Sequence, residues 1–169
     1  MMDLKEKKEL FYILLRELEN GSRLMGEYDS IPKLYGDILL YQVECHTVQI
    51  IGRYDCIKLY ELAEEMNKTN SAVSQIIKKL VKKGLVYNFR NPDNNREVLL
   101  SLTDLGKKVY EEHEHIDYEA EKKLFALIQD LSIDDIKSYI KIQKIFNKQF
   151  FEDVKNNYET YNDYIENNK

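Results

Sequence analysis

The chain has 169 residues, of which 43% are hydrophobic and 33% are charged, and its formal net charge is −5. This length and balance fit one folded domain that buries a core and is rich in helix. No apolar run reaches the roughly 18–20 residues of a membrane span, and the N-terminus lacks the small-residue cleavage site of a signal peptide.

The first third of the chain predicts two helices joined by a connection. Residues 4–26 carry apolar side chains at helical spacing, which indicates a long amphipathic helix. Pro32 interrupts the pattern, so we expect 27–37 to be a connection. A second helix is predicted over 38–51 and ends at Gly52, because glycine tolerates the positive φ that often follows a helix.

Two further helices separated by a polar turn come next. They are predicted over 59–66 and 70–83, with Thr69 or Asn70 as the N-cap of the second. Gly84 stands where a left-handed cap is expected to end that helix. A helix, a polar turn and a helix in this order indicate a helix-turn-helix motif.

A β-hairpin is predicted directly after the motif. The segments 85–90 and 96–102 are rich in β-branched, aromatic and aliphatic residues, and residues 91–95 between them have turn chemistry throughout. We therefore expect two short strands with a polar, exposed tip.

The last third of the chain returns to the helical period. A helix is predicted from Thr103, with a narrow apolar stripe typical of a helix that packs on another helix. Ser132 begins a further helix, with Asp135 three positions on as a weak capping box. The Asn- and Tyr-rich residues 156–169 either continue this helix or fray.

Charge is distributed unevenly along the chain. No acidic residue lies between Asn67 and Pro92, whereas acidic residues crowd 111–121. The acid-free stretch holds six basic residues: Lys68, Lys78, Lys79, Lys82, Lys83 and Arg90. One basic face on an acidic body suits a protein that contacts phosphates at a single surface.

The predicted helix over 70–83 has two chemically different sides at about 100° per residue. The apolar side comprises Val73, Ile76, Ile77, Leu80 and Val81. The other side comprises Ser71, Gln75, Lys78 and Lys82, flanked by Ser74 and Lys79. A helix that recognises bases in the major groove needs hydroxyl and amide groups in its first turns, followed by ammonium groups that contact phosphates.

A surface helix that only solvates its lysines would have the same pattern, and the hairpin that follows favours DNA binding. Arg96 lies just after the polar tip, where its extended side chain could enter a narrow minor groove. Helix-turn-helix followed by a basic hairpin is a winged-helix arrangement. The sequence thus predicts a mainly α fold with a small β-hairpin wing, in the α+β class.

The outer helices carry more apolar surface than the compact middle block can cover, which predicts a homodimer built from both ends of the chain. We expect four parts. They are an N-terminal dimerisation helix and connection over 1–37, a winged helix-turn-helix core over 38–103, C-terminal dimerisation helices over 104–155, and a polar tail over 156–169.

The function class that fits best is a sequence-specific DNA-binding transcriptional regulator, and we expect a repressor. An enzyme is not indicated, because the chain has no Gly-rich phosphate loop, nucleophile elbow or HExxH pair. The alternative is an adaptor that uses the same fold to bind proteins. An adaptor would not need an acid-free lysine face, and its binding would not weaken steeply with salt.

The block from Leu59 to Thr103 is similar to the DNA-binding core of the MarR family, through ELAEEM, SAVSQIIKKLVKKGLV, NPDNNR and LSLTDLGKKV. The resemblance implies a dimer on a pseudo-palindromic duplex, with Arg96 as the wing arginine. It also implies DNA contacts at Thr69, Asn70, Ser71, Ala72, Ser74 and Gln75. Asn94 stands where the family often has an aspartate; its amide can hydrogen-bond the wing backbone but cannot form an ion pair with Arg96.

An effector site is expected between the dimerisation helices and the DNA-binding core. The run LTDLGKKVYEEHEHID resembles that of the family's zinc-sensing branch. On that pattern His46, His113 and Asp117 would bind zinc with Glu27, as an effector and not as a required cofactor. Asp117 replaces a histidine of the branch, and zinc accepts carboxylate oxygen. Alternatively, His46 packs against the dimerisation helices and His113 is a surface residue.

Two other effectors remain open from the sequence. Cys45 and Cys56 could sense an oxidant, but neither lies in a clear cationic cluster, and we expect both to be buried as small hydrophobic groups in a cytoplasmic protein. An aromatic small molecule could occupy a cleft lined by tyrosines such as Tyr12, Tyr28, Tyr35 and Tyr41.

Overall fold

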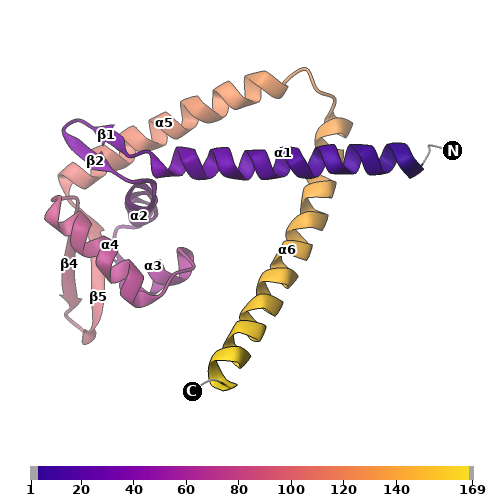
Figure 1. Cartoon of the computed structure of the whole chain (residues 1–169). Coiled ribbons are helices and arrows are strands. Elements are labelled where there is room, and N and C mark those ends of the chain that lie inside the picture. The colour runs from indigo at the N-terminus through magenta and orange to yellow at the C-terminus, as the bar shows by residue number, and fades with distance from the viewer. Residues whose placement is uncertain (1–3, 168–169) are drawn as a thin grey trace. The chain divides into compact units, whose positions relative to one another are not determined.

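The computed structural model describes residues 4–167 (Figure 1). The chain divides into two compact units, Met1–Glu119 and Ala120–Lys169. Helices dominate the described residues, and two small antiparallel sheets accompany them. The predicted mainly α fold with a small β component is therefore confirmed.

The first helix, α1, spans Leu4–Ser30, four residues further than the predicted end at residue 26. None of its side chains is buried. Exposed apolar residues recur along its length, including Leu10, Leu24 and Tyr28. The helix therefore has the amphipathic pattern expected from the sequence, and much of its apolar surface is exposed in the described chain.

A hairpin that the sequence analysis did not predict follows α1. Strand β1 (Lys33–Tyr35) pairs with β2 (Ile38–Leu40) around Gly36, whose φ is +55°. Tyr35 and Leu40 are buried. The prediction that a helix begins at residue 38 was wrong, because strand β2 occupies these residues. Three apolar residues in a row fit a strand or a helix equally well.

Helix α2 (Gln42–Gly52) ends at the predicted glycine for a different reason from the one expected. Gly52 does not have a positive φ; within the described residues only Gly36, Gly84 and Asn67 do. A Cβ added at Gly52 would lie 2.5 Å from Cδ2 of Tyr110. Close packing of the Tyr110 ring on the backbone therefore requires the glycine.

The winged-helix part of the fold follows the predicted order. It consists of β3 (Ile57–Lys58), α3 (Leu59–Glu65), α4 (Asn70–Lys82), β4 (Val86–Asn91) and β5 (Asn94–Leu102). The three strands form one sheet in the order β3-β5-β4, with both pairs antiparallel. Strand β3 escaped prediction because two residues carry no periodic signal.

The two ends of α4 are fixed as the sequence predicts. Thr69 is the N-cap, and its side-chain oxygen accepts a hydrogen bond from the backbone N–H of Ala72 at 3.2 Å. Gly84 follows the helix with a φ of +73°. The cap and the glycine determine where the helix starts and stops, and therefore which side chains it exposes.

One hydrophobic core joins the winged helix to α2 and to the start of α5. Its fully buried members include Leu40, Ile51, Leu62, Leu80 and Leu100. Val73 and Ile77 pack into the same core from α4. Burial of one side of α4 leaves its other side outward, which is the geometry that the candidate interface needs.

The chain ends in two long helices, α5 (Asp104–Ile128) and α6 (Ile133–Asn167). Ser132 caps α6: its hydroxyl accepts from the N–H of Asp135 at 3.1 Å, and the Asp135 carboxylate accepts from the N–H of Ser132 at 3.2 Å. The predicted capping box is confirmed. Helix α6 continues to Asn167, so the tail from residue 156 is helical as far as the structure describes it, and residues 168 and 169 lie outside the described part.

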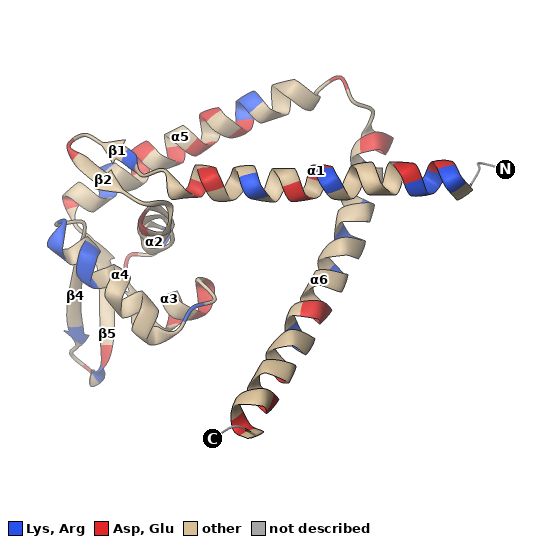
Figure 2. Ribbon diagram, viewed as in Figure 1, with Lys and Arg blue, Asp and Glu red and all other residues tan. Residues whose placement is uncertain are grey.

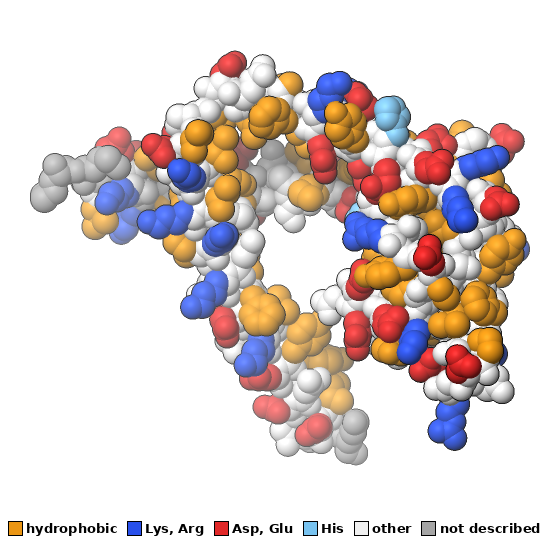
Figure 3. Space-filling model, turned by 180° about the vertical axis from the view of Figure 1, so that it is seen from behind, with side chains coloured by type: hydrophobic (Ala, Val, Ile, Leu, Met, Phe, Trp, Pro, Cys, Tyr) orange, Lys and Arg blue, Asp and Glu red, His pale blue; other side chains and the backbone are white. Residues whose placement is uncertain are grey.

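Helix α6 buries no side chain, and the space-filling view shows hydrophobic side chains along its surface (Figure 3). Charged residues interrupt both long helices. Among residues 4–167, no helix combines the length and the apolar character that crossing a membrane requires.

Candidate nucleic-acid interface and effector site

The outward side of α4 is basic and free of acidic groups. Ser71, Gln75, Lys78, Lys79 and Lys82 are all exposed on this helix. The coloured ribbon of Figure 2 shows basic positions on α4 and near the tip of β4–β5, and no acidic position on α4. The described structure therefore places these five predicted DNA-contacting residues on one accessible element.

The other predicted DNA-contacting residues at the start of α4 are mostly less accessible. Ala72 and Ser74 are half-buried, and Thr69 uses its hydroxyl oxygen to cap the helix. Asn70 is exposed at the first helical position. The first backbone N–H groups of a helix have no partner within the helix, and this end of a helix favours negatively charged partners.

Lys83 differs from the other lysines of the acid-free stretch. Its ammonium group donates hydrogen bonds to both carboxylate oxygens of Glu44, at 2.8 and 2.7 Å, and to the backbone oxygen of Leu39 at 2.8 Å. The side chain of Glu44 is only 4% exposed. Lys83 thus ties the end of α4 to β2 and α2, a structural role that residue type and spacing could not reveal.

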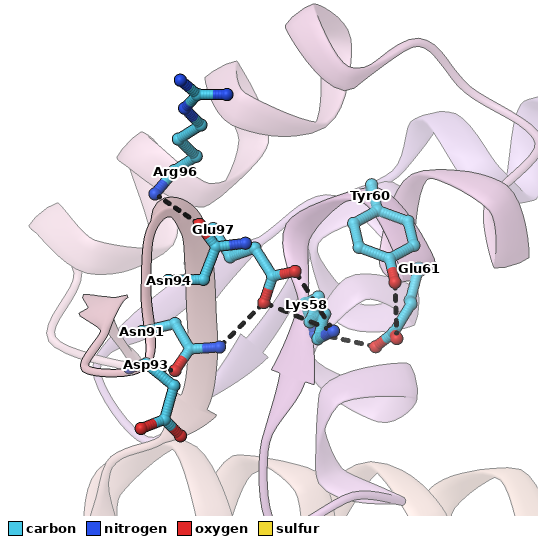
Figure 4. A network of polar contacts seen from close by, with 8 residues as sticks. All are labelled: Lys58, Tyr60, Glu61, Asn91, Asp93, Asn94, Arg96 and Glu97. Atoms are coloured by element: carbon cyan, nitrogen blue, oxygen red, sulfur yellow. Dashed lines mark hydrogen bonds and ion pairs between the residues drawn. The ribbon is translucent and has the colours of Figure 1, made fainter.

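The wing presents Arg96 beside its tip, where Figure 4 shows the guanidinium extending away from the neighbouring side chains. The side-chain oxygen of Asn94 accepts a hydrogen bond from the backbone N–H of Arg96 at 3.2 Å. The amide at this position therefore bonds the wing backbone, as the sequence analysis expected of Asn94.

A buried polar cluster joins β1, α2 and α5. His113 on α5 is 1% exposed, and its Nδ1 lies 2.7 Å from the hydroxyl oxygen of Tyr35. The Cys45 thiol donates to the same hydroxyl oxygen at 3.5 Å. The prediction that Cys45 is buried is confirmed, and the alternative that His113 lies on the surface is wrong.

Burial dominates the electrostatics of this cluster. It lowers the pKa of His113, although Asp117 opposes the shift. It raises the pKa of Tyr35 and of Cys45, so all three groups are held in their neutral forms at neutral pH. A neutral imidazole is the form that binds a metal ion.

The four predicted metal ligands are only partly brought together. Nε2 of His113 is buried without a hydrogen-bond partner and lies 3.5 Å from Oδ2 of Asp117. His46 is exposed, with Nε2 at 3.1 Å from Nε2 of Gln42, so it does not pack inside a helix interface of the described chain. Glu27 is exposed on α1 and forms an ion pair with Arg23 at 2.6 Å.

Within residues 4–167, no group of three His, Cys, Asp or Glu side chains has a geometry that could hold a metal ion. The described structure therefore provides a His113–Asp117 pair and not a complete site.

An open hollow of about 720 Å³ lies beside the winged helix. Its lining includes Tyr41, His46, Ile50, Arg53 and Met66. The hollow combines apolar surface with two side-chain amides, one tyrosine hydroxyl and side chains of both charges, among them Asp29, Glu65 and Lys68. Apolar surface with a few polar groups is typical of small-molecule sites.

The other residues considered for effector binding lie elsewhere. Tyr12 and Tyr28 are exposed on α1, and Tyr35 is buried in the polar cluster. Cys56 is exposed, so the prediction that it is buried was wrong. It falls in the short connection between α2 and β3, where the chain crosses the surface.

Comparison with known proteins finds a family model and curated regulators that are similar to parts of this chain. Residues 40–98 match the model of the MarR family. The HTH-type transcriptional regulator YhjH of Bacillus subtilis (strain 168), itself uncharacterised, is 28% identical over 134 residues, which are 76% of this chain and 77% of YhjH. The transcriptional regulator AdcR of Streptococcus pyogenes serotype M6 is 25% identical over 134 residues, covering 79% and 86% of the two chains.

Solved structures share the fold. ZitR of Lactococcus lactis, a zinc-responsive MarR family member, superposes with a TM-score of 0.70 at 18% identity, over 83% of this chain and 99% of ZitR. FabT of Streptococcus pneumoniae, solved in complex with DNA, superposes with a TM-score of 0.63 at 22% identity, over 87% of this chain and 99% of FabT.

Proposed function

We propose that the chain, whose residues 40–98 match the model of the MarR family, represses transcription as a homodimer bound to a pseudo-palindromic operator. The match to this family model and to curated HTH-type transcriptional regulators supports the prediction that the chain is a DNA-binding regulator and not an enzyme. The observation that carries the proposal is the acid-free, exposed side of α4, which is followed along the chain by a wing with an exposed arginine, Arg96.

The proposed contacts follow from the chemistry of each exposed group. Ser71 and Gln75, near the start of α4, would hydrogen-bond base edges in the major groove. Lys78, Lys79 and Lys82 would contact phosphates, because an ammonium group recognises charge without reading sequence. Arg96 would enter the adjacent minor groove.

The test reverses charge on α4. Exchanging both Lys78 and Lys82 for glutamate should abolish the shift of an A·T-rich pseudo-palindromic duplex, because two attractive contacts become repulsive. The matched control exchanges Lys137 and Lys141 of α6 for glutamate, which changes the net charge equally on a different element. The measurement is duplex binding at several salt concentrations.

Two outcomes would contradict the proposed interface. Equal binding by the α4 variant and the parent would mean that α4 does not face DNA. Parent binding that stays constant as salt rises would favour a protein-binding adaptor, because phosphate contacts release counterions and lose affinity steeply with salt.

We propose zinc as the effector, bound by His113 and Asp117 and completed by His46 and Glu27. The orphaned Nε2 of His113 and its 3.5 Å distance to Asp117 support this assignment. The zinc-responsive regulator ZitR has the same fold. When bound, zinc would take imidazole nitrogen and carboxylate oxygen as ligands.

Elemental analysis tests the zinc proposal directly. Protein incubated with excess zinc and then desalted should retain metal, and a His113→Ala variant should retain less. The control is His115→Ala, because His115 is exposed two residues away on the same helix. Zinc-free parent protein, or a His113→Ala variant that retains the full amount, would remove zinc as the effector.

A small aromatic molecule is the second candidate effector, and the hollow lined by Tyr41, Ile50 and Arg53 supports it. Apolar walls with a few polar groups suit a small aromatic molecule. Selection of bound duplexes from a random pool, with and without zinc, separates the two candidates, because only a metal effector changes the recovered pool when zinc is the sole addition.

A further inference from the structure

The wing strand β5 contains a bulge that displaces Arg96 from the ladder. Arg90 is paired with Val98, and the next residue, Asn91, is already paired with Asn94. Residues 95–97 of β5 therefore have no opposite residue on β4. A bulge of this kind re-aims a side chain that a regular strand would hold in the pleat.

Hydrogen bonds hold the bulge at both ends. On one side the amide oxygen of Asn94 accepts from the N–H of Arg96 at 3.2 Å. On the other side Oε2 of Glu97 accepts from the side-chain amide of Asn91 at 2.8 Å, and that amide's oxygen accepts from the N–H of Asp93 at 3.1 Å. Both strands of the tip are thus connected through Asn91.

Glu97 also connects the wing to the helix-turn-helix. The ammonium group of Lys58 on β3 lies 3.3 Å from its carboxylate. Lys58 is itself fixed, because its backbone N–H donates to Oε2 of Glu61 at 3.0 Å at the start of α3. Figure 4 shows this network below the tip, with Arg96 extending from the other side.

The charge of Glu97 is compensated within the protein. Its side chain is 23% exposed and that of Lys58 is 33% exposed. The hydrogen bond from Asn91 is the main cause that lowers the pKa of Glu97, and Lys58 lowers it further. The carboxylate is therefore ionised at neutral pH, next to a surface that is proposed to meet phosphates.

We propose that Glu97 is a positioning residue for DNA binding: together with Lys58 and Asn91 it fixes the 95–97 bulge and thereby aims Arg96 into the minor groove. The proposal rests on the proposed DNA-binding function. It explains how a wing with Asn94 in place of an aspartate holds its arginine without an ion pair to it.

The proposal predicts an effect opposite in sign to that of simple electrostatics. Removing a carboxylate near DNA reduces repulsion of phosphates and should tighten binding. Glu97→Gln should instead weaken binding by roughly three- to tenfold, a fraction of the roughly 5- to 150-fold that a base-contacting arginine supplies. Asp93→Asn is the matched control, because Asp93 is exposed at the tip and should show the simple tightening.

A double-mutant cycle separates positioning from general stability. The affinities of the parent, Glu97→Gln, Arg96→Ala and the double variant are measured on one A·T-rich pseudo-palindromic duplex at fixed salt. If Glu97 acts through Arg96, its substitution no longer weakens binding once Arg96 is gone. Lys58→Met provides a second variant that breaks the same ion pair from β3, and circular dichroism verifies the fold of each protein.

The outcomes distinguish this proposal from the proposed function. A parent protein that does not bind the duplex at low salt overturns the function itself. A parent that binds, with Glu97→Gln and Lys58→Met binding as tightly or more tightly, overturns only the positioning role. Losses that add in the double variant also overturn it, because they would show that Glu97 and Arg96 act independently.

Discussion

The winged-helix core and the two terminal helices have similar amphipathic sequences but opposite burial. Helix α4 buries Val73, Ile77 and Leu80 against other elements of the same chain. Helices α1 and α6 together bury no side chain in the described structure, although apolar residues recur along both.

The difference is that the central core is buried within one chain, whereas the terminal helices leave much of their apolar surface exposed in it. Most apolar residues of α6 fall on one side of the helix at about 100° per residue: Ile136, Tyr139, Ile140, Phe146, Phe150, Val154, Tyr158 and Tyr161. Basic and acidic residues occupy the opposite side. A continuous apolar stripe of this length is unfavourable in water, and we expect a second copy of the chain to cover it.

The largest effect is expected from a charge placed in the stripe. In Phe150→Glu, each of two symmetric copies would lose the burial of a phenyl ring, about 1.5–3 kcal/mol per copy. Dimer affinity should fall by at least about a hundredfold. Sedimentation equilibrium should then give the mass of one chain at micromolar concentration.

Lys148→Glu is the control for this substitution, because Lys148 lies on the charged side of the same helix. It should leave the dimer intact. If Phe150→Glu sediments as the parent does, the stripe is not the dimer interface, and the comparison between centre and ends loses its explanation.

A smaller effect is expected where the core holds a charge. Lys83→Ala would leave the buried carboxylate of Glu44 without its ammonium partner. Breaking a fully buried pair costs about 3–5 kcal/mol; because Lys83 is 30% exposed, we expect about 1–3 kcal/mol of lost unfolding free energy. Urea unfolding measures this loss.

Lys79→Ala provides the opposite result on the same helix. Lys79 is exposed, so its removal should change stability by less than about 0.5 kcal/mol while weakening DNA binding. The division between structural and DNA-facing lysines is incorrect if the two variants have equal stability. It is also incorrect if Lys83→Ala weakens DNA binding and Lys79→Ala does not.

These two lysines show how far the sequence could predict the site. The apolar period placed α4 and its exposed side, and Gly84 and Thr69 fixed its ends, because all of these signals are local. The ion pair of Lys83 with Glu44 joins residues 39 positions apart, and no periodicity indicates such a contact. The burial of His113 and the network of Glu97 were missed for the same reason.

The smallest effect concerns the polar cluster of the core. Tyr35→Phe keeps the ring but removes the hydroxyl that lies 2.7 Å from Nδ1 of His113, so a buried nitrogen loses its partner. We expect a loss of about 1 kcal/mol in unfolding free energy, measured in urea without metal. Tyr28→Phe, at a residue that is 53% exposed, should cause no loss.

Because the cluster belongs to the core and not to the terminal stripe, the cost of Tyr35→Phe should be the same in the Phe150→Glu background. A cost that disappears in that background would mean that dimerisation at the chain ends supports the core, and that the two regions are not energetically separate.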